Sequence, residues 1–189
     1  MDATTLLIAD HNRVRGLFAR FNTAKEKDDT GTLTALGAAI AEELRVHTTI
    51  EEEVFYPWVH GLNDELAEVV DEGIQEHHVV KTLLDEIAML PAGEDDWMAK
   101  MAVVIENVEH HAEEEEKEMF PTLRGASTED DRERVGSELE TKKASLGAPV
   151  VEDKIDLTTE TLRELAAAQE IPGRSKMSHE ELAATVAPG

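Results

Sequence analysis

The chain has 189 residues, a formal net charge of −24 and no cysteine. Without cysteine it can have no disulfide framework, thiolate metal site or cysteine nucleophile, so any metal must be bound through nitrogen and oxygen atoms. The negative charge opposes the binding of nucleic-acid phosphates and anionic membranes over most of the surface. The length suits one domain of about 100 to 150 residues with a small appendage.

The N-terminal sequence MDATTLLIADHNRVR lacks the basic flank and apolar run of a secretion signal, and no stretch of 18 apolar residues occurs in the chain. We therefore expect a cytoplasmic protein with no membrane contact. Abundant Glu, Ala, Leu and Val, together with few aromatic residues, favour helices over a sheet-rich fold.

Four segments carry apolar residues at alternating spacings of three and four, which predicts four amphipathic helices of about 20 residues or more. Their apolar stripes run from Leu7 to Phe21, Ile40 to Trp58, Leu66 to Ile87 and Trp97 to Met119. The expected breaks are the polar run KEKDDTGT, Pro57 with Gly61, Pro91 with Gly93, and Pro121 with Gly125. Short connections between long helices favour an all-α, up-down-up-down four-helix bundle.

The remaining sequence predicts one extra helix and a small C-terminal module. Ser127 and Asp130 are typical of a capping box, which would start a fifth helix that runs to about Leu146 and lies against the outside of the bundle. After Gly147 and Pro149 the composition changes to that of a linker followed by two short helical segments. We therefore divide the chain into a bundle at 1–146, a linker at 147–156 and a helix-loop-helix module at 157–189.

Polar residues interrupt each predicted apolar stripe. Each helix contributes one histidine to its stripe, and the second and fourth helices add a glutamate one turn later. The six residues are His11, His47, Glu51, His77, His111 and Glu115. Burying an unpaired imidazole or carboxylate costs several kcal/mol, which a partner, a shifted pKa or a metal ion relieves. No Lys or Arg shares these stripes, so a pair of metal dications is the expected source of positive charge.

The pattern is repeated within the chain. HTTIEEEVFYP and HAEEEEKEMFP both place Glu four residues and Pro ten residues after the His. DHNRVRGLF and EHHVVKTLL share an acidic residue, the His, and then Val, a basic residue and Leu at the same spacings. One HxxxE has little value in so acidic a chain, but its ordered repetition favours a built site over chance.

Neighbouring histidines and glutamates have a different phase on their helices. We expect surface positions for His60, His78, His110 and His179. We also expect solvated side chains at Glu52, Glu53 and Glu116, with Glu52 as an alternative ligand.

Four imidazoles and two carboxylates offer three protein ligands to each of two ions, and the glutamates could bridge them. Mixed nitrogen and oxygen ligands suit Fe, Mn or Zn better than Mg or Ca. Iron is favoured, with Mn and Zn as open alternatives. A ferritin-like site is disfavoured, because it needs Glu-x-x-His on two helices and no Glu stands three residues before any His.

With these motifs, residues 1 to about 125 resemble the hemerythrin-like, or HHE cation-binding, family, whose pattern is His, HxxxE, His, HxxxE. The resemblance implies a non-haem di-iron centre with an oxo or hydroxo bridge and two bridging glutamates. The oxygen-carrying members have a fifth histidine where Lys81 stands, and an Asp where Glu116 stands. These departures disfavour simple oxygen carriage and favour reaction with peroxide, O2 or NO.

Three functions remain open at this point. The first is a redox-active di-iron protein that consumes or senses small oxidants, which includes an oxidoreductase acting on peroxide or NO. The second is a protein that stores, senses or delivers iron without turnover. The third is a structural bundle with hydrogen-bonded histidines. Metal analysis tests the third, and a peroxide-decay assay separates the first two.

The C-terminal segment resembles the small helix-loop-helix modules related to the Rho N-terminal and SAP-type motifs. The resemblance implies nucleic-acid contacts at Arg174 and Lys176, in the loop IPGRSKM. Residues 150–189 carry more acidic than basic side chains, so such contacts should be weak and salt-sensitive. A protein-docking or solubilising role is the alternative.

Overall fold

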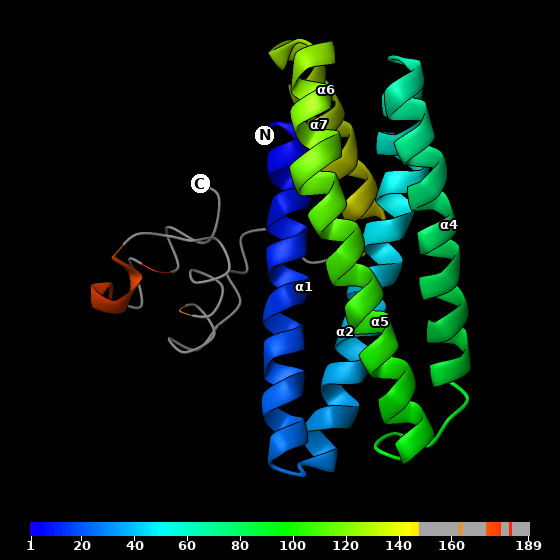
Figure 1. Cartoon of the computed structure of the whole chain (residues 1–189), viewed down its shortest axis with the longest axis vertical. Helices are drawn as coiled ribbons and strands as arrows, with labels where there is room; N and C mark the ends of the chain where they lie inside the picture. The colour runs from blue at the N-terminus through cyan, green and yellow to red at the C-terminus, as the bar shows by residue number, and fades with distance from the viewer. Residues whose placement is uncertain (148–162, 164–172, 179–181, 183–189) are drawn as a thin grey trace.

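The computed structural model describes residues 1–147, 163, 173–178 and 182, and in this part of the chain the regular structure is helical, with no strand (Figure 1). Four long helices dominate, and two of them continue through a π segment into a short helix. The elements are α1 (Ala3–Glu26), α2 (Thr30–Ile50), π segment η1 (Glu51–Phe55), α3 (Tyr56–His60), α4 (Asp64–Ile87), α5 (Asp95–Glu114), π segment η2 (Glu115–Met119), α6 (Phe120–Ala126), α7 (Glu129–Ser145) and a 3-10 turn, η3 (Arg174–Lys176).

The long helices α1, α2, α4 and α5 lie side by side as a bundle (Figure 1). Contacts between α1 and α2, α2 and α4, α4 and α5, and α5 and α1 close the ring. The connections at residues 27–29 and 88–94 lie at the same end of the bundle (Figure 1). Each helix therefore turns one side toward a shared interior.

Side-chain caps fix where several helices begin. Asp2 accepts a hydrogen bond from the Thr4 amide at the start of α1, and Asn63 caps α4 in the same way. The cap of α7 is Thr128, whose hydroxyl accepts from the Asp131 amide, so the predicted capping box was placed one residue too early.

The two prolines that were expected to break helices do not end them. The chain stays helical through Pro57 as far as His60, and through Pro121 as far as Ala126. Each proline is the second residue of a new α-helical segment that follows a π segment. In a continuing helix a proline removes one backbone hydrogen bond and crowds the preceding turn, and here the change to π hydrogen bonding directly before each proline accompanies that disruption.

Two apolar clusters fill the interior of the bundle, one toward each end. One includes Phe21, Leu44 and Trp97, and the other includes Leu6 and Phe120, all of them buried. Burial of each such side chain contributes about 1.5–3 kcal/mol. In sequence, the stripe histidines lie between residues of the two clusters, so the polar layer crosses the bundle between two dry regions.

Helix α7 packs against α1 and η1, so the expected extra helix lies on the bundle. Leu139 is fully buried there, and Lys143 pairs with Asp10 in a buried ion pair. At Gly136 an added Cβ would come within 1.9 Å of the Met1 carbonyl oxygen, so the close approach of α7 to the N-terminus requires glycine.

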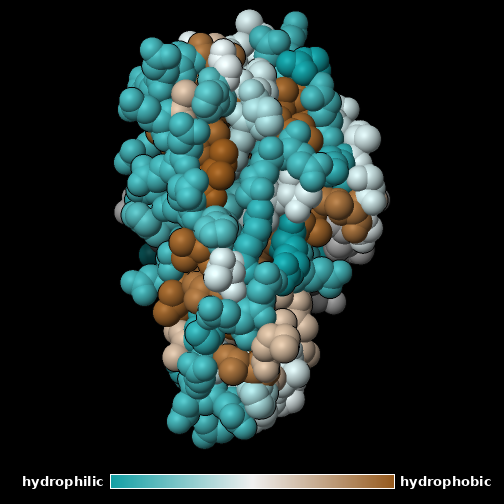
Figure 2. All heavy atoms as spheres, turned by 90° about the vertical axis from the view of Figure 1, so that its right-hand side faces the viewer, coloured by the Kyte–Doolittle hydropathy of each residue, from teal (hydrophilic) through white to brown (hydrophobic). Residues whose placement is uncertain are grey.

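Most of the predicted linker and C-terminal module, 147–156 and 157–189, lies outside the described residues, as does His179. Within the C-terminal module, the described residues 173–178 contain the η3 turn, in which Lys176 is exposed and Arg174 is half-buried. None of the described helices is long and apolar enough to span a membrane. The face that carries α4 is largely hydrophilic, with small separate apolar patches (Figure 2).

Candidate metal centre

All six stripe residues that the sequence predicts meet in the interior of the bundle. Each has 6% or less of its surface exposed. Their ligand atoms form two groups in which the atoms lie within 4.8 Å of one another: His11, His47, Glu51 and Glu115 in the first, and Glu51, His77 and His111 in the second.

The first group joins α1 to the two π segments and α2. His47 Nε2 lies 3.2 Å from Glu51 Oε2, and His11 Nε2 lies 3.2 Å from Glu115 Oε2. The two imidazole rings meet edge to face, with centroids 4.9 Å apart. Two nitrogens and two carboxylates thus converge on one small volume.

The second group joins α4 and α5 to η1. His77 Nε2 lies 3.1 Å from His111 Nε2 and 3.3 Å from Glu51 Oε2. His111 Nε2 is 3.8 Å from Glu115 Oε1. Glu51 therefore belongs to both groups, and Glu115 reaches from the first toward the second.

In the first group, an outer carboxylate holds the other nitrogen of a histidine. His11 Nδ1 lies 2.8 Å from Glu116 Oε1, and the same oxygen accepts a hydrogen bond from Arg15 Nη1 at 2.8 Å. Glu116 is thus partly buried, and the expectation of a merely solvated side chain was wrong. Such a partner fixes the orientation of a ligand imidazole and increases its basicity.

The second group contains the same arrangement. His77 Nδ1 lies 3.1 Å from Glu52 Oε1, and Lys81 Nζ donates to Glu52 at 2.6 Å. Hydrogen bonding by His77 and Lys81 lowers the pKa of Glu52 to about 2, even though burial opposes the shift. Glu52 holds His77 in place, and Lys81 donates to both oxygens of that carboxylate. The expectation of a solvated side chain was therefore wrong for Glu52 as well.

The two groups differ in how their second histidine is held. His111 Nδ1 lies 2.6 Å from Glu76 Oε2. That contact lowers the pKa of Glu76. His47 Nδ1 is buried without a hydrogen-bond partner among the described residues. The second group is therefore braced at both imidazoles, and the first at only one.

Tyr56 is a member of the centre that the sequence reasoning missed. Its hydroxyl donates to Glu115 Oε1 at 3.0 Å and lies 3.2 Å from His111 Nε2 and 3.5 Å from His77 Nε2. The side chain is 1% exposed. Burial and the charges of Glu115 and Glu51 raise the pKa of Tyr56 well above its usual value, so the phenol is neutral in the metal-free protein.

The π segment explains why periodicity did not reveal Tyr56. Tyr56 is five positions after Glu51, a spacing that would place the two side chains about 140° apart around an α-helix. In η1 the Tyr56 amide instead bonds to the Glu51 carbonyl, which closes the turn over five residues. The matching position in the second repeat is Phe120, whose ring stacks at 6.2 Å on that of His11.

The two central carboxyl groups have opposite pKa shifts. Burial and the neighbouring Glu115 charge raise the pKa of Glu51 well above its usual value. Burial also opposes ionisation of Glu115, but the charge of His111 and the close contact with His11 outweigh it and lower the pKa of Glu115. Without a metal ion, the surroundings thus favour the neutral form of Glu51 and the charged form of Glu115.

The two imidazoles of the first group also diverge. Burial opposes protonation of His11, but the adjacent carboxylates of Glu115 and Glu116 raise its pKa to about 10. Burial and the His11 charge lower the pKa of His47 well below its usual value. A protonated and a neutral imidazole so close together show how little positive charge the protein itself supplies.

The donor set fits a pair of metal ions. Four buried ligand atoms that face the centre have no hydrogen-bond partner among the described residues: His11 Nε2, both Glu51 oxygens and Glu115 Oε2. Unsatisfied buried polar atoms are rare and costly. Nitrogen and oxygen ligands bind such metals at about 2.1 Å, so neighbouring ligands on one ion are about 3 Å apart. The spacings of 3.1–3.3 Å agree with that value.

The other described histidines are exposed, as their helical phase predicts. They are His60, His78 and His110. His110 nevertheless takes part in a half-exposed group with Glu76 and Glu114, whose ligand atoms also lie within 4.8 Å of one another. Glu53 is exposed, as expected, and pairs with Lys142.

Two small cavities reach the centre from different sides. One, of about 10 Å³, is lined by His11, His47, Arg15 and mainly apolar side chains. The other, of about 40 Å³, extends from exposed glutamates to His111 and Glu115.

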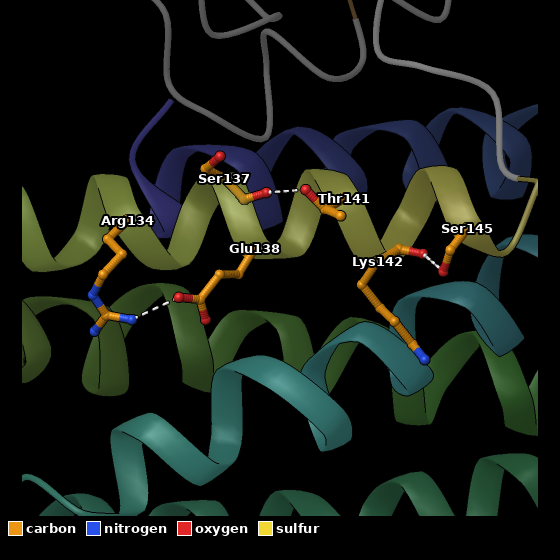
Figure 3. A pocket seen from close by; sticks show the side chains of 6 residues that line it. All are labelled: Arg134, Ser137, Glu138, Thr141, Lys142 and Ser145. Carbon is orange, nitrogen blue, oxygen red and sulfur yellow. Dashed lines mark hydrogen bonds and ion pairs between the residues drawn. The ribbon is translucent and has the colours of Figure 1, made fainter.

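A larger open recess of about 590 Å³ runs along α7 (Figure 3). Its lining residues are Arg134, Ser137, Glu138, Thr141, Lys142 and Ser145. All six come from one helix, and Arg134 is already paired with Glu138, so the recess offers no converging donor set.

Residues 2–123 match the family model described as the Hemerythrin HHE cation binding domain. The chain belongs to the hemerythrin HHE family. The matched range contains both groups of ligand atoms and confirms the resemblance of the bundle. It does not extend to the C-terminal segment, for which the Rho N-terminal and SAP-type resemblance stays a prediction.

Two curated proteins are similar to this chain. An uncharacterized hemerythrin-like protein of Schizosaccharomyces pombe is 25% identical over 138 residues, which cover 72% of this chain and 66% of that protein. A DNA nickase of Nostoc sp. is 24% identical over 148 residues, which cover 77% of this chain and 40% of that protein. The chain thus spans about two thirds and two fifths of their lengths. No solved structure matches the chain significantly.

Proposed function

We propose that this hemerythrin-family chain is a di-iron protein that reacts with, or senses, O2, peroxide or NO. Two iron ions would be held by the six buried stripe residues: His11, His47, Glu51, His77, His111 and Glu115. The observation that carries the proposal is the pair of ligand groups that share Glu51, with four buried ligand atoms left without hydrogen-bond partners. The proposal assumes an up-down-up-down order of the long helices, which the short connections support.

Iron in such a centre supplies a reversible ferrous–ferric couple and open positions for a small oxidant. The chain supplies the rest. Glu51 faces both groups and is placed to bridge them, and Glu115 extends toward both as well. Glu116 and Glu52 hold the outer nitrogens of His11 and His77. The apolar clusters border the layer toward both ends of the bundle.

The surroundings of the fifth-histidine position favour reaction over simple oxygen carriage. Lys81 stands there and is bound to Glu52, so it adds no donor to the centre. Tyr56 instead brings a neutral hydroxyl within 3.5 Å of both histidines of the second group. A hydroxyl beside the centre could donate a hydrogen bond or a proton to a bound small molecule.

Metal analysis and peroxide decay test the proposal on the full chain. We expect about two iron ions per chain after anaerobic loading with Fe2+, and visible bands of oxo-bridged ferric iron after oxidation. We expect the loaded protein to consume hydrogen peroxide. Zinc-loaded protein is the control, because zinc binds similar ligands but has no redox chemistry.

The alternative is an iron-binding or delivery protein without turnover. It would give the same metal content but no peroxide, O2 or NO consumption above that of the zinc-loaded control. Failure to bind iron, manganese or zinc at all would leave only a structural bundle.

We propose no nuclease activity by analogy with the Nostoc relative, because a net charge of −24 opposes contact with DNA phosphates. A cytoplasmic location, and weak contacts of Arg174 and Lys176 with nucleic acid or protein, stay predictions.

A further inference from the structure

The wider of the two cavities at the centre lies between α4 and the α5–η2 helix. It has a volume of about 40 Å³, and its lining includes Glu72 and Glu118, which are exposed, and His111 and Glu115, which are buried. A water molecule needs about 10–15 Å³ of such a cavity, so this space could hold more than one water molecule. The cavity therefore leads from the surface to the second ligand group.

The charge of this cavity is suited to a cation. Its lining contains five glutamates and no lysine or arginine. The cavity on the other side of the centre holds only about 10 Å³ and is lined by Arg15 among mainly apolar side chains. A recess lined by one sign of charge concentrates ions of the opposite sign and raises their rate of association. A dication would thus be drawn to the acidic cavity, whereas at the other cavity Arg15 is paired with Glu109 and Glu116 and leaves no excess of negative charge.

Two glutamates that line this cavity form a ligand-like group with His110, which is not itself a lining residue. Glu76, His110 and Glu114 have ligand atoms within 4.8 Å of one another, and His110 Nε2 lies 3.3 Å from Glu114 Oε1. The His110 side chain is 63% exposed, Glu114 36% and Glu76 22%, so the group becomes more buried toward Glu76. Such a site could bind an ion that still keeps part of its water shell.

Glu76 links this outer group to the centre, because its Oε2 lies 2.6 Å from His111 Nδ1. At the inner end of the cavity, Glu115 is 1% exposed. Its Oε1 lies 3.8 Å from His111 Nε2 and its Oε2 lies 3.2 Å from His11 Nε2, so this one carboxylate joins the cavity to both ligand groups. Oε2 has no hydrogen bond among the described residues, which leaves a buried charge for a cation to compensate.

We propose that this acidic cavity is the route by which divalent metal enters the centre. Glu76, His110 and Glu114 bind the incoming ion first, and Glu72 and Glu118 attract it electrostatically. The ion then passes along the cavity to His111 and Glu115. The proposal rests on the proposed metal centre but not on its reactivity with oxidants.

The rate of metal uptake tests the route. The metal-free full chain is mixed with Co2+ in a stopped-flow instrument, and binding is followed by the visible absorption of the coordinated ion. The test variant carries Glu72→Gln, Glu114→Gln and Glu118→Gln, and it spares Glu76, which holds His111. The control carries Glu129→Gln, Glu133→Gln and Glu140→Gln, three exposed positions on α7 with the same total charge change.

We expect uptake by the test variant to be about tenfold slower than by the control at low ionic strength, with the same final amount of Co2+ bound. The difference should shrink in about 1 M salt, where the screening length falls to about 3 Å. Glu114→Lys alone should slow uptake further than Glu114→Gln. Circular dichroism checks that each variant keeps its helices.

Equal uptake rates in the test and control variants would overturn the route while leaving the metal centre in place. A lower final amount of Co2+ with an unchanged rate would also overturn it, because the rim glutamates would then act as ligands rather than as an entry. If the unmodified chain bound neither Co2+ nor Fe2+, the metal centre itself would be wrong. The three results are distinguishable in one set of titrations.

Discussion

The first and second ligand groups, which are the two halves of the centre, arise from the same repeated sequence pattern but differ in the polar contacts of their histidines. In both, a histidine is held by the glutamate that follows a central glutamate, and that outer glutamate is paired with a basic side chain. The second half has two additional polar contacts: Glu76 on His111 and the Tyr56 hydroxyl. The first half has an unpartnered nitrogen on His47 instead.

This difference indicates separate tasks for the two halves. The second half, with both imidazoles braced and an acidic cavity beside it, is built to hold an ion firmly. The first half, with one imidazole unbraced and Phe120 stacked on His11, has fewer groups that would stabilise a fixed arrangement. We therefore expect the second half to bind its ion more tightly, and the first to tolerate more change when a small molecule binds.

Removal of the carboxylate of Glu51, which both halves share, should abolish the difference in metal affinity between the halves and give the largest effect. We expect Glu51→Ala to reduce bound iron from about two ions per chain to well below one, and to abolish stabilisation by metal. In the metal-free protein the same change should cost little, because it deletes a buried carboxyl group whose oxygens lack partners. Metal analysis and thermal unfolding with and without iron measure both effects. The control is Glu42→Ala on the exposed side of α2.

Binding of two iron ions by the Glu51→Ala protein would contradict the bridging role of Glu51. A large loss of stability in the metal-free form would also contradict the prediction, since it would mean that the carboxyl group stabilises the fold itself.

Much of the centre follows from the sequence because helical period alone orients its ligands. All six stripe residues are buried, whereas His78 and His110, the histidines next to two of them, are exposed. The period does not reveal contacts that come from other helices, which is why Glu116 was expected in solvent. It also fails where the period itself changes: the π turn in η1 brings Tyr56 to the centre, and the helix continues through Pro57.

The contact between Glu76 and His111 can be weakened without changing any of the six predicted metal ligands. Glu76→Gln replaces the charged acceptor of the His111 ring with a neutral one, which should weaken binding in the second half by about 10- to 100-fold. Titration against a chelator should then show that the ion formerly bound more tightly is lost at lower chelator concentration. Glu65→Gln, on an exposed part of the same helix, is the control. An equal loss from both halves would argue against the difference proposed between them.

Tyr56→Phe should have a smaller effect, because it makes the second half resemble the first at the position of Phe120. Glu115 would lose a hydrogen bond worth about 1 kcal/mol, so we expect about two ions per chain with affinity lowered by less than tenfold. The visible spectrum of the oxidised iron form should shift, since the groups around the second ion change. An unchanged spectrum would show that the hydroxyl does not contact the metal environment.

The smallest effect is expected when a histidine next to a ligand is changed. His78→Ala and His110→Ala should leave equilibrium iron content unchanged, because both side chains are exposed, whereas His77→Ala and His111→Ala should each release metal. Metal analysis of the four proteins at equilibrium decides the matter, and the reverse result would invalidate the helical phase on which the ligand set depends. His110→Ala carries extra information: in the proposed entry route it should slow loading while sparing the final content, so the same variant separates a residue that delivers metal from one that keeps it.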